Sequence, residues 1–398
     1  MSAYLIEWAN LLGRWVHMIT GVAWIGASFY FVWLDNHLEE PKAAEDADKG
    51  ISGEVWSVHG GGFYHAQKYQ VAPGKLPETL HWFKWEAYTT WISGMFMLAL
   101  MYWYGAEIYL IDPGVAELSK PLAIAIGVVV IIAGWFAYDW LCKSAIGKNE
   151  NQLALIMFVV LTILAFFLCQ IFSGRGAYMH FGAMLGTIMV GNVFFVIIPG
   201  QKDLVQAKLD GRQPEAIHGI RGKQRSVHNT YFTLPVLFVM ISNHYAMTYG
   251  HSLNWLILIG ITLIGALIRI YFVARHKGNA SLIPVFAAAA LLIGIIALMA
   301  PSKVTPLAAE STQTVAAETA YKIVTERCSS CHASAPSQPG FAAAPKGIVF
   351  DTEDDMIRQA AVIHQQTVLT KAMPIGNLTG ITDAERTLLD QWYLQLER

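Results

Sequence analysis

The first 300 residues alternate long apolar runs with shorter polar segments. Eight of these runs have about the twenty residues that a helix needs to cross the hydrocarbon core of a bilayer. They cover 9–34, 87–109, 121–141, 153–173, 177–199, 230–248, 253–275 and 280–300. The pattern therefore predicts an all-α fold, in which a polytopic membrane domain has eight transmembrane helices.

The pattern changes after Pro301. The text SKVTPLAAESTQ that follows is small, polar and typical of a linker, and the rest of the chain is far more polar than the first 300 residues. We therefore divide the chain into a transmembrane domain at 1–300, a linker at 301–313 and a second domain at 314–398. Helices are expected near 315–327 and 383–396 in the second domain.

Composition agrees with a membrane protein. Hydrophobic residues make up 55% of the chain and charged residues only 14%, which is far from an ordinary soluble domain. The formal net charge is -2, so nothing indicates a nucleic-acid partner. Lipid is the expected surrounding of the first domain.

The second domain carries the text RCSSCHASAP, in which Cys328, Cys331 and His332 form C-x-x-C-H. This is the attachment signature of c-type haem. A zinc knuckle would need a second ligand pair and a thioredoxin-like thiol pair would need a βαβ pattern, and the sequence shows neither. Met373 lies 41 residues beyond His332, where it can be the second axial ligand, as in small class I cytochromes c. We expect one covalent haem c.

Haem attachment and charge predict the same orientation. Haem is attached to C-x-x-C-H outside the bacterial inner membrane, so the second domain should be periplasmic, and an even number of spans places the N-terminus there too. The connections on the inner side carry 15 Lys and Arg, whereas those outside carry only Lys120 and Arg175, as the positive-inside rule requires. The N-terminal text has no basic segment or cleavage site and should remain as part of the first helix.

Three histidines from three predicted spans lie at a similar depth near the outer surface. They are His17, His180 and His244, and ionisable residues at membrane depth are usually functional. We interpret them as ligands of haem b, present as one or two groups, with Arg14 and Arg175 available to its propionates. Alternatively, each histidine is a hydrogen-bonded residue of the core.

A second set of ionisable residues gathers towards the inner surface. His65 and Lys68 belong to the text VHGGGFYHAQKY, and Asp139 and Arg269 belong to predicted spans. One interpretation is an ion pair between Asp139 and Arg269 that ties two helices together. The other is an anionic-substrate pocket formed by these four residues, with Arg269 as anchor and a histidine as base.

The first apolar run also supports His17 as a haem ligand. Its text HMITGVAWIGASFYF resembles the first helix of the membrane protoporphyrinogen oxidase and copper-resistance D families, in which a histidine is followed by tryptophan and glycine at this spacing.

The whole chain resembles the membrane-bound, cytochrome c-linked urate oxidases of bacteria. The resemblance rests on WVHMITGVAWIGASFYFVWL, VHGGGFYHAQKY, KWEAYTTWISG and CSSCH with its later MP. It implies oxidation of urate to 5-hydroxyisourate in purine catabolism, without peroxide. Electrons would pass through haem b to haem c, and then to a soluble cytochrome c or a terminal oxidase.

Two other functions fit the same architecture. The first is a non-catalytic cytochrome b/c subunit that relays electrons for a separate dehydrogenase or quinol-oxidising complex. The second is a haem or metal transporter with a sensing domain.

Overall fold

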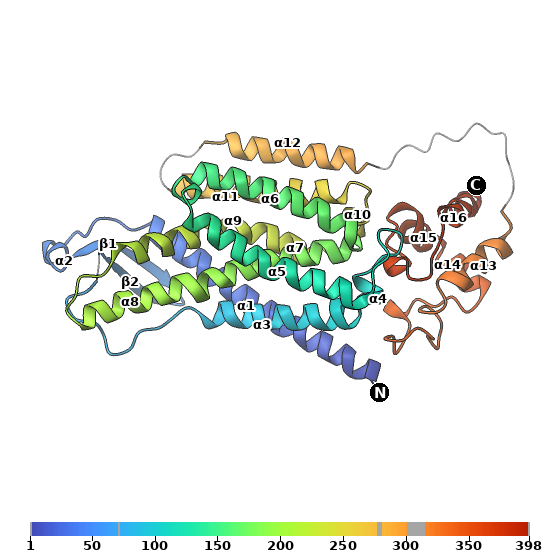
Figure 1. Cartoon of the computed structure of the whole chain (residues 1–398), viewed down its shortest axis with the longest axis horizontal. Helices are drawn as coiled ribbons and strands as arrows, with labels where there is room; N and C mark the ends of the chain where they lie inside the picture. The colour runs from blue at the N-terminus through green and yellow to red at the C-terminus, as the bar shows by residue number, and fades with distance from the viewer. Residues whose placement is uncertain (1, 71, 277–280, 301–314, 397–398) are drawn as a thin grey trace.

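A computed structural model of the chain describes residues 2–70, 72–276, 281–300 and 315–396. Long helices occupy each of the apolar runs and pack side by side in alternating directions (Figure 1). They are α1 (Ser2–Asn36), α3 (Trp85–Leu98), α5 (Lys120–Lys143), α6 (Glu150–Ile171), α7 (Gly174–Gly191), α9 (Ala216–Ser242), α11 (Asn254–His276) and α12 (Ile283–Leu298).

Two of these helices continue beyond their α-helical part. The π-helical segment η1 (Ala99–Tyr104) extends α3, while η3 (Asn192–Ile197) and α8 (Ile198–Leu209) extend α7. Within the described residues, five helices are long and apolar enough to cross a membrane, and α12 is a shorter apolar helix. The protein is therefore mostly helical and built to associate with a membrane, whereas eight crossings remain a prediction.

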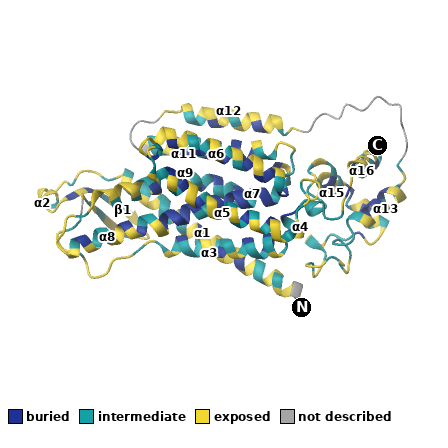
Figure 2. Ribbon diagram, viewed as in Figure 1, coloured by how far each residue is buried: buried dark blue, intermediate teal, exposed yellow. Residues whose placement is uncertain are grey.

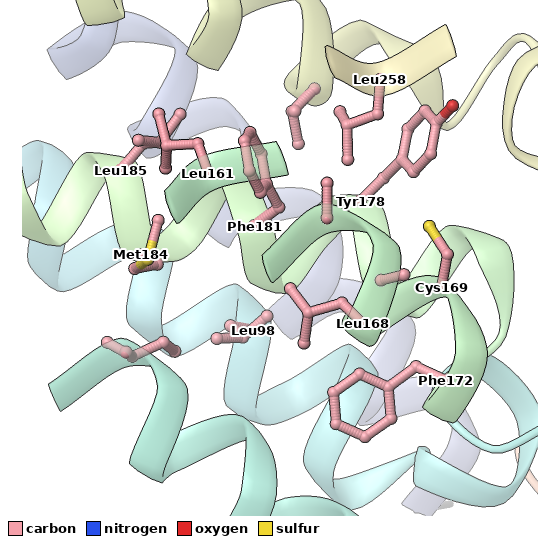
Figure 3. Close-up of a cluster of buried hydrophobic side chains, with 14 of the residues drawn as sticks. Leu98, Leu161, Leu168, Cys169, Phe172, Tyr178, Phe181, Met184, Leu185 and Leu258 are labelled. Atoms are coloured by element: carbon pink, nitrogen blue, oxygen red, sulfur yellow. The ribbon is translucent and has the colours of Figure 1, made fainter. Parts of the chain in front are cut away.

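Helix α7 lies at the centre of the bundle, packed against α3, α5, α6 and α9. Its side chains supply much of the buried core, including the fully buried Tyr178, Phe181 and Leu185 (Figure 3). Two of its glycines allow close packing: a Cβ atom at Gly182 would overlap Val239 of α9, and one at Gly191 would overlap Trp135 of α5.

The outer surface of the bundle is apolar. Ile163 on α6 is 63% exposed and Ile293 on α12 is 67% exposed, and exposed positions recur along these helices (Figure 2). Large exposed apolar surface marks contact with a membrane or a partner. Here it covers helices of bilayer length, so lipid is its natural environment.

The all-α prediction is wrong for one segment, the connection that precedes α3. After the short helix α2 (Ala44–Asp48), strands β1 (Ile51–His59) and β2 (Gly62–Tyr69) pair as an antiparallel hairpin. The turn between them contains Gly60 and Gly61, both at positive φ, a region that glycine adopts at no steric cost. The glycine run therefore serves the hairpin turn.

The bundle has two distinct ends (Figure 1). One, the hairpin end, carries β1, β2, α2 and α8. The other, the docking end, is formed by α4 (Ala106–Tyr109), the following segment 110–119 and α10 (Ala246–Tyr249). The start of α1 and the C-terminal domain both lie at the docking end.

The C-terminal domain has a hydrophobic core of its own. Helices are present at both predicted positions, as α13 (Ala317–Arg327) and α16 (Asp383–Leu396). Val324, Met356, Leu389 and Trp392 lie in the core between them. The remaining elements are η4 (Pro345–Gly347), α14 (Glu353–Arg358), α15 (Ala360–Ile363), η5 (His364–Leu369) and η6 (Ile375–Asn377).

One ion pair joins the first and last helices of this domain. Arg327 Nη2 lies 2.9 Å from Glu385 Oε1, and Arg327 Nη1 also donates to the Thr379 carbonyl at 2.7 Å. Burial raises the pKa of Glu385, but hydrogen bonds from Thr382 and Arg327 outweigh it and hold the pKa below its ordinary value of 4.5.

Glu385→Gln should therefore destabilise the C-terminal domain by about 1 kcal/mol. Because the folded-state pKa is depressed, the stabilisation is present above pH 4.5 and is lost as the pH falls through the folded pKa. Hydrogen exchange of α13 and α16 amides at neutral and acidic pH measures this. If the destabilisation caused by Glu385→Gln became larger on acidification, the assigned role of the Arg327–Glu385 ion pair would be contradicted.

Candidate functional site

The C-x-x-C-H motif begins where α13 ends. Cys328 caps the helix, its amide donating to the Val324 carbonyl at 2.8 Å, and His332 lies one turn further, its amide bonded to the Cys328 carbonyl at 3.0 Å. The turn that follows α13 holds both cysteines and the histidine in one short stretch of chain. Neither thiol is in a disulfide.

The ring of His332 is oriented by a backbone carbonyl. Its Nδ1 lies 2.9 Å from the Ile348 carbonyl oxygen, which can only accept, so Nδ1 carries the proton. Nε2 then keeps its lone pair, as in metal-ligating histidines whose other nitrogen donates to a carbonyl. Phe350 lies beside the ring, with centroids 5.3 Å apart.

The two thiols are held in their neutral form. Burial raises the pKa of Cys328 to about 12 and also raises that of Cys331. Met373 is positioned by its main chain: its amide donates to the Gln366 carbonyl at 3.0 Å, and its carbonyl accepts from Arg386 at 3.1 Å. Two unpaired thiols, an imidazole with a free Nε2 and a thioether form a donor set that fits haem c.

The three histidines of the bundle have separate surroundings. His17 faces α3, where its Nδ1 lies 3.0 Å from the Thr90 carbonyl and 3.1 Å from Ser93 Oγ. Gly94 leaves room for the ring, since a Cβ atom there would lie 2.9 Å from His17 Cε1. Nε2 of His17 has no hydrogen-bond partner among the described residues, so it is available as a ligand.

His180 is fully buried in the bundle core. Its Nδ1 donates to the Gly176 carbonyl at 2.9 Å, and its Nε2 accepts from Trp103 Nε1 at 3.2 Å. Its ring also lies against Gly127 of α5. Both nitrogens are therefore satisfied by the protein, and iron ligation by His180 would require loss of the Trp103 hydrogen bond.

The third histidine, His244, is exposed just after α9. Arg14, one turn before His17, donates to Asn10 at 2.7 Å. Arg175 bonds to Asn243 Oδ1 at 2.7 Å and to the Tyr102 hydroxyl at 3.1 Å. The three histidines thus differ in burial and in hydrogen-bond partners, and their role as haem b ligands stays a prediction.

Asp139 pairs with a residue that the sequence interpretation did not consider. Arg225 of α9 lies 2.8 Å from Asp139 Oδ1, and Lys143 lies 2.6 Å from its Oδ2. The interpretation of an Asp139–Arg269 ion pair is therefore wrong. Arg225 reaches Asp139 from α9, whereas Arg269 lies on a different helix, α11, where its guanidinium packs on Phe29.

The Asp139–Arg225 pair belongs to a buried polar network near the hairpin end. Asn192 of η3 accepts from Arg225 at 3.3 Å and donates to the Tyr138 hydroxyl at 3.1 Å. That hydroxyl lies 2.7 Å from His228 Nδ1, and His228 Nε2 lies 3.2 Å from Glu150. Because the Glu150 carboxylate accepts from Nε2 of His228, the Nδ1 atom of the neutral ring accepts the Tyr138 proton. The network ties α5, η3 and α9 together.

Most residues of this network are hard to recognise in the sequence. Tyr138 and Asn192 sit within apolar runs, where a single hydroxyl or amide does not stand out. The detectable signal was the pair Tyr138–Asp139 on one helix, together with Arg225, His228 and Asn229 spaced three or four residues apart along another. Such spacing places residues on one helix face.

His65 and Lys68 lie on strand β2 rather than within the helix bundle. His65 Nε2 bonds to Glu54 at 2.8 Å, and its ring stacks on Trp56 with centroids 4.1 Å apart. Lys68 pairs with Asp35 at 2.7 Å. No contact described by the structure joins either residue to Arg269 or Asp139, so the four candidate substrate residues do not form a single cluster.

Arg269 of α11 is the most unusual cation of the bundle. It is only 8% exposed, and its Nε has no hydrogen-bond partner among the described side chains and main chain. The guanidinium lies over the ring of Phe29, 4.8 Å from its centroid. A buried N–H group without a hydrogen-bond partner is costly, and an anion would satisfy it.

The residues that the structure describes contain no group of three or more His, Cys, Asp or Glu side chains placed to hold a metal ion. Fold and site together define a membrane-type helix bundle that carries a small C-terminal C-x-x-C-H domain. The family model described as urate oxidase N-terminal matches residues 3–300, and the chain belongs to this family. No curated protein and no solved structure matches it.

Family membership indicates a urate-related function and an oxidoreductase, with urate as the suggested substrate. The matched region ends where the bundle ends. It includes Arg269 and the polar network, and leaves out the C-x-x-C-H domain.

Asp139→Asn should destabilise the protein by about 3–5 kcal/mol, because it leaves the buried Arg225 guanidinium without an acid. The double variant with Arg225→Met should recover most of this loss. Lys143→Met is the matched control and should cost less than about 1 kcal/mol, since Lys143 is at the surface. Thermal unfolding in detergent ranks the variants. Recovery by Arg269→Gln in place of Arg225→Met would contradict the observed pairing.

Proposed function

We propose that the protein is a membrane-bound urate oxidase that converts urate to 5-hydroxyisourate and passes the electrons to haem c in its own C-terminal domain. The observation that carries the proposal is the combination in one chain of a urate oxidase family bundle and a docked domain with a haem c donor set. That set consists of Cys328, Cys331, His332 and Met373. In this proposal the docking end is periplasmic and the hairpin end is cytoplasmic.

The reaction balances without oxygen as the oxidant. The urate monoanion and one water yield neutral 5-hydroxyisourate, one proton and two electrons, with the water oxygen bonded to C5 of the ring. Bound haem c would accept one electron at a time, so oxidation of one urate requires two successive electron transfers. A soluble cytochrome c or a terminal oxidase then takes the electrons, and no peroxide forms.

Arg269 is the residue that we propose binds the substrate anion. Urate is planar and negatively charged at neutral pH, so its site needs a cation and an aromatic surface. Arg269 offers an unpartnered Nε beside Phe29. Arg225 is less suitable because Asp139 already neutralises it. His65 is bonded to Glu54, and a role as base would require the hairpin to approach the bundle.

Among the three candidate ligands of haem b, His17 fits the role best. Its Nε2 has no hydrogen-bond partner among the described residues, whereas His180 is bonded to Trp103 and His244 is exposed.

Anaerobic addition of urate to the purified full-length protein should reduce haem c, with about half a urate consumed per haem, because each urate supplies two electrons. Visible absorption spectroscopy measures the reduction. The variant Cys328→Ala/Cys331→Ala should contain no covalent haem and show no such reduction. If the wild-type haem stays oxidised until a separate dehydrogenase or a quinol is added, the protein is an electron relay and the proposal fails.

Arg269→Gln should raise the Michaelis constant for urate by about tenfold or more, because a charge-assisted hydrogen bond to the anion is lost. Covalent haem content should not change. Arg212→Gln is the matched control, since Arg212 pairs with Asp210 at the surface, and its Michaelis constant should stay at the wild-type value. An unchanged Michaelis constant in Arg269→Gln would remove Arg269 from the substrate site.

A further inference from the structure

The segment that carries Met373 is also the segment through which the C-terminal domain touches the bundle. On one side of Met373, the Thr370 carbonyl packs directly against Gly250, which follows α10. On the other side, Gly376 packs against α4 and the segment after it. A Cβ atom at Gly376 would lie 2.9 Å from both the Ile108 and Ile111 carbonyl oxygens. We call residues 370–377 the distal loop.

Within its own domain the distal loop is held by several bonds, among them those of Arg386 of α16. This guanidinium is only 8% exposed and donates to the carbonyls of Met373 and Thr367. It also interacts electrostatically with Asp112, which belongs to the docking end of the bundle. The same side chain therefore binds the main chain of Met373 and faces the other domain.

His332, the predicted proximal ligand, is supported by contacts within the C-terminal domain. His332 is oriented by the Ile348 carbonyl and flanked by Phe350, and both lie in the C-terminal domain. The one glycine near this side that faces the bundle, Gly340, would place a Cβ atom at an ordinary 3.6 Å from Ile108. Among the described glycines, the close approaches between the two domains thus lie on the distal side.

We propose that the helix bundle is part of the support of the distal haem ligand, so that Met373 is held more firmly while the C-terminal domain is docked than when it is free. Thr370 and Gly376 are fixed by the bundle, and Met373 lies between them with its main chain bonded to Gln366 and Arg386. Arg386 acts as a positioning residue rather than a catalytic one. The inference rests on the proposed haem c.

The arrangement has a chemical consequence. A thioether ligand raises the reduction potential of haem, and residues that support a ligand commonly change its binding about tenfold to a hundredfold. Separation of the domains would loosen the support of Met373, which would lower the potential of the bound haem and let an external ligand compete with the thioether. Haem c would therefore be the better electron acceptor when it is docked on the bundle.

The test uses full-length protein with substitutions at Gly250, which is outside the C-terminal domain and distant in sequence from both haem ligands. Gly250→Ala places a methyl group against the Thr370 carbonyl, and Gly250→Gln adds a side chain that the docked arrangement cannot hold. Gly222→Ala is the matched control, because nothing lies within 4 Å of a Cβ atom there. The measurements are covalent haem content, the midpoint potential of haem c and imidazole binding to the oxidised haem.

We expect imidazole to bind about tenfold more tightly in the Gly250→Gln variant, with a smaller effect in Gly250→Ala and none in Gly222→Ala. The potential should fall in the same order. Wild-type potential and imidazole affinity in Gly250→Gln would overturn the inference. Absence of covalent haem from the wild-type protein would instead overturn the proposed function, so the two failures are distinguishable.

Discussion

Inside an apolar helix bundle, every buried polar group must find its partner within the protein, because lipid offers none. This requirement fixes which helices are neighbours. Arg225 is satisfied only where α9 meets Asp139 of α5 and Asn192 of η3. His180 is satisfied only where α7 meets Trp103 of η1. Arg269 stands apart, because its Nε is left without a partner in the described part of the protein.

The satisfied and unsatisfied groups have different functional meanings. A complete network rigidifies the bundle and specifies one packing arrangement. Near the hairpin end, Glu150, His228 and Tyr138 join the protein surface to the buried Asn192 through consecutive hydrogen bonds. A buried polar group without a hydrogen-bond partner is instead a place where a bound ligand would stabilise the protein. The contrast between Arg225 and Arg269 is therefore the strongest structural reason to assign the substrate to Arg269.

Much of the fold could be predicted because the lengths of the apolar runs and the local motifs can be read directly from the sequence. The apolar runs located the helices, α13 and α16 were expected at their observed positions, and consecutive residues fixed the C-x-x-C-H geometry. The β hairpin was missed, although alternation in EVWSVH and FYHAQKY is typical of strands. The polarity of this connection before α3 is equally typical of a loop.

The site was harder to predict because sequence gives depth but not rotation about a helix axis. Asp139 and Arg269 both belong to predicted spans, whereas Arg225 lies ahead of the predicted span at 230–248 and becomes part of the bundle because α9 begins at Ala216. Likewise, a similar depth is predicted for His17, His180 and His244, yet one faces α3, one is enclosed between α5 and η1, and one is exposed. Only the helix packing separates these cases.

In the C-terminal domain, the two candidate haem ligands are supported by contacts of different origin. Its proximal histidine depends on nearby chain: Ile348 and Phe350 follow His332 closely and belong to the same domain. Its candidate distal methionine depends on α16 of the same domain and also on the docking end of the bundle, which is far away in sequence. A strong iron–imidazole bond tolerates an autonomous support, whereas the weaker thioether ligand gains most from an external one. The more easily exchanged ligand thus lies on the side that faces the proposed source of electrons.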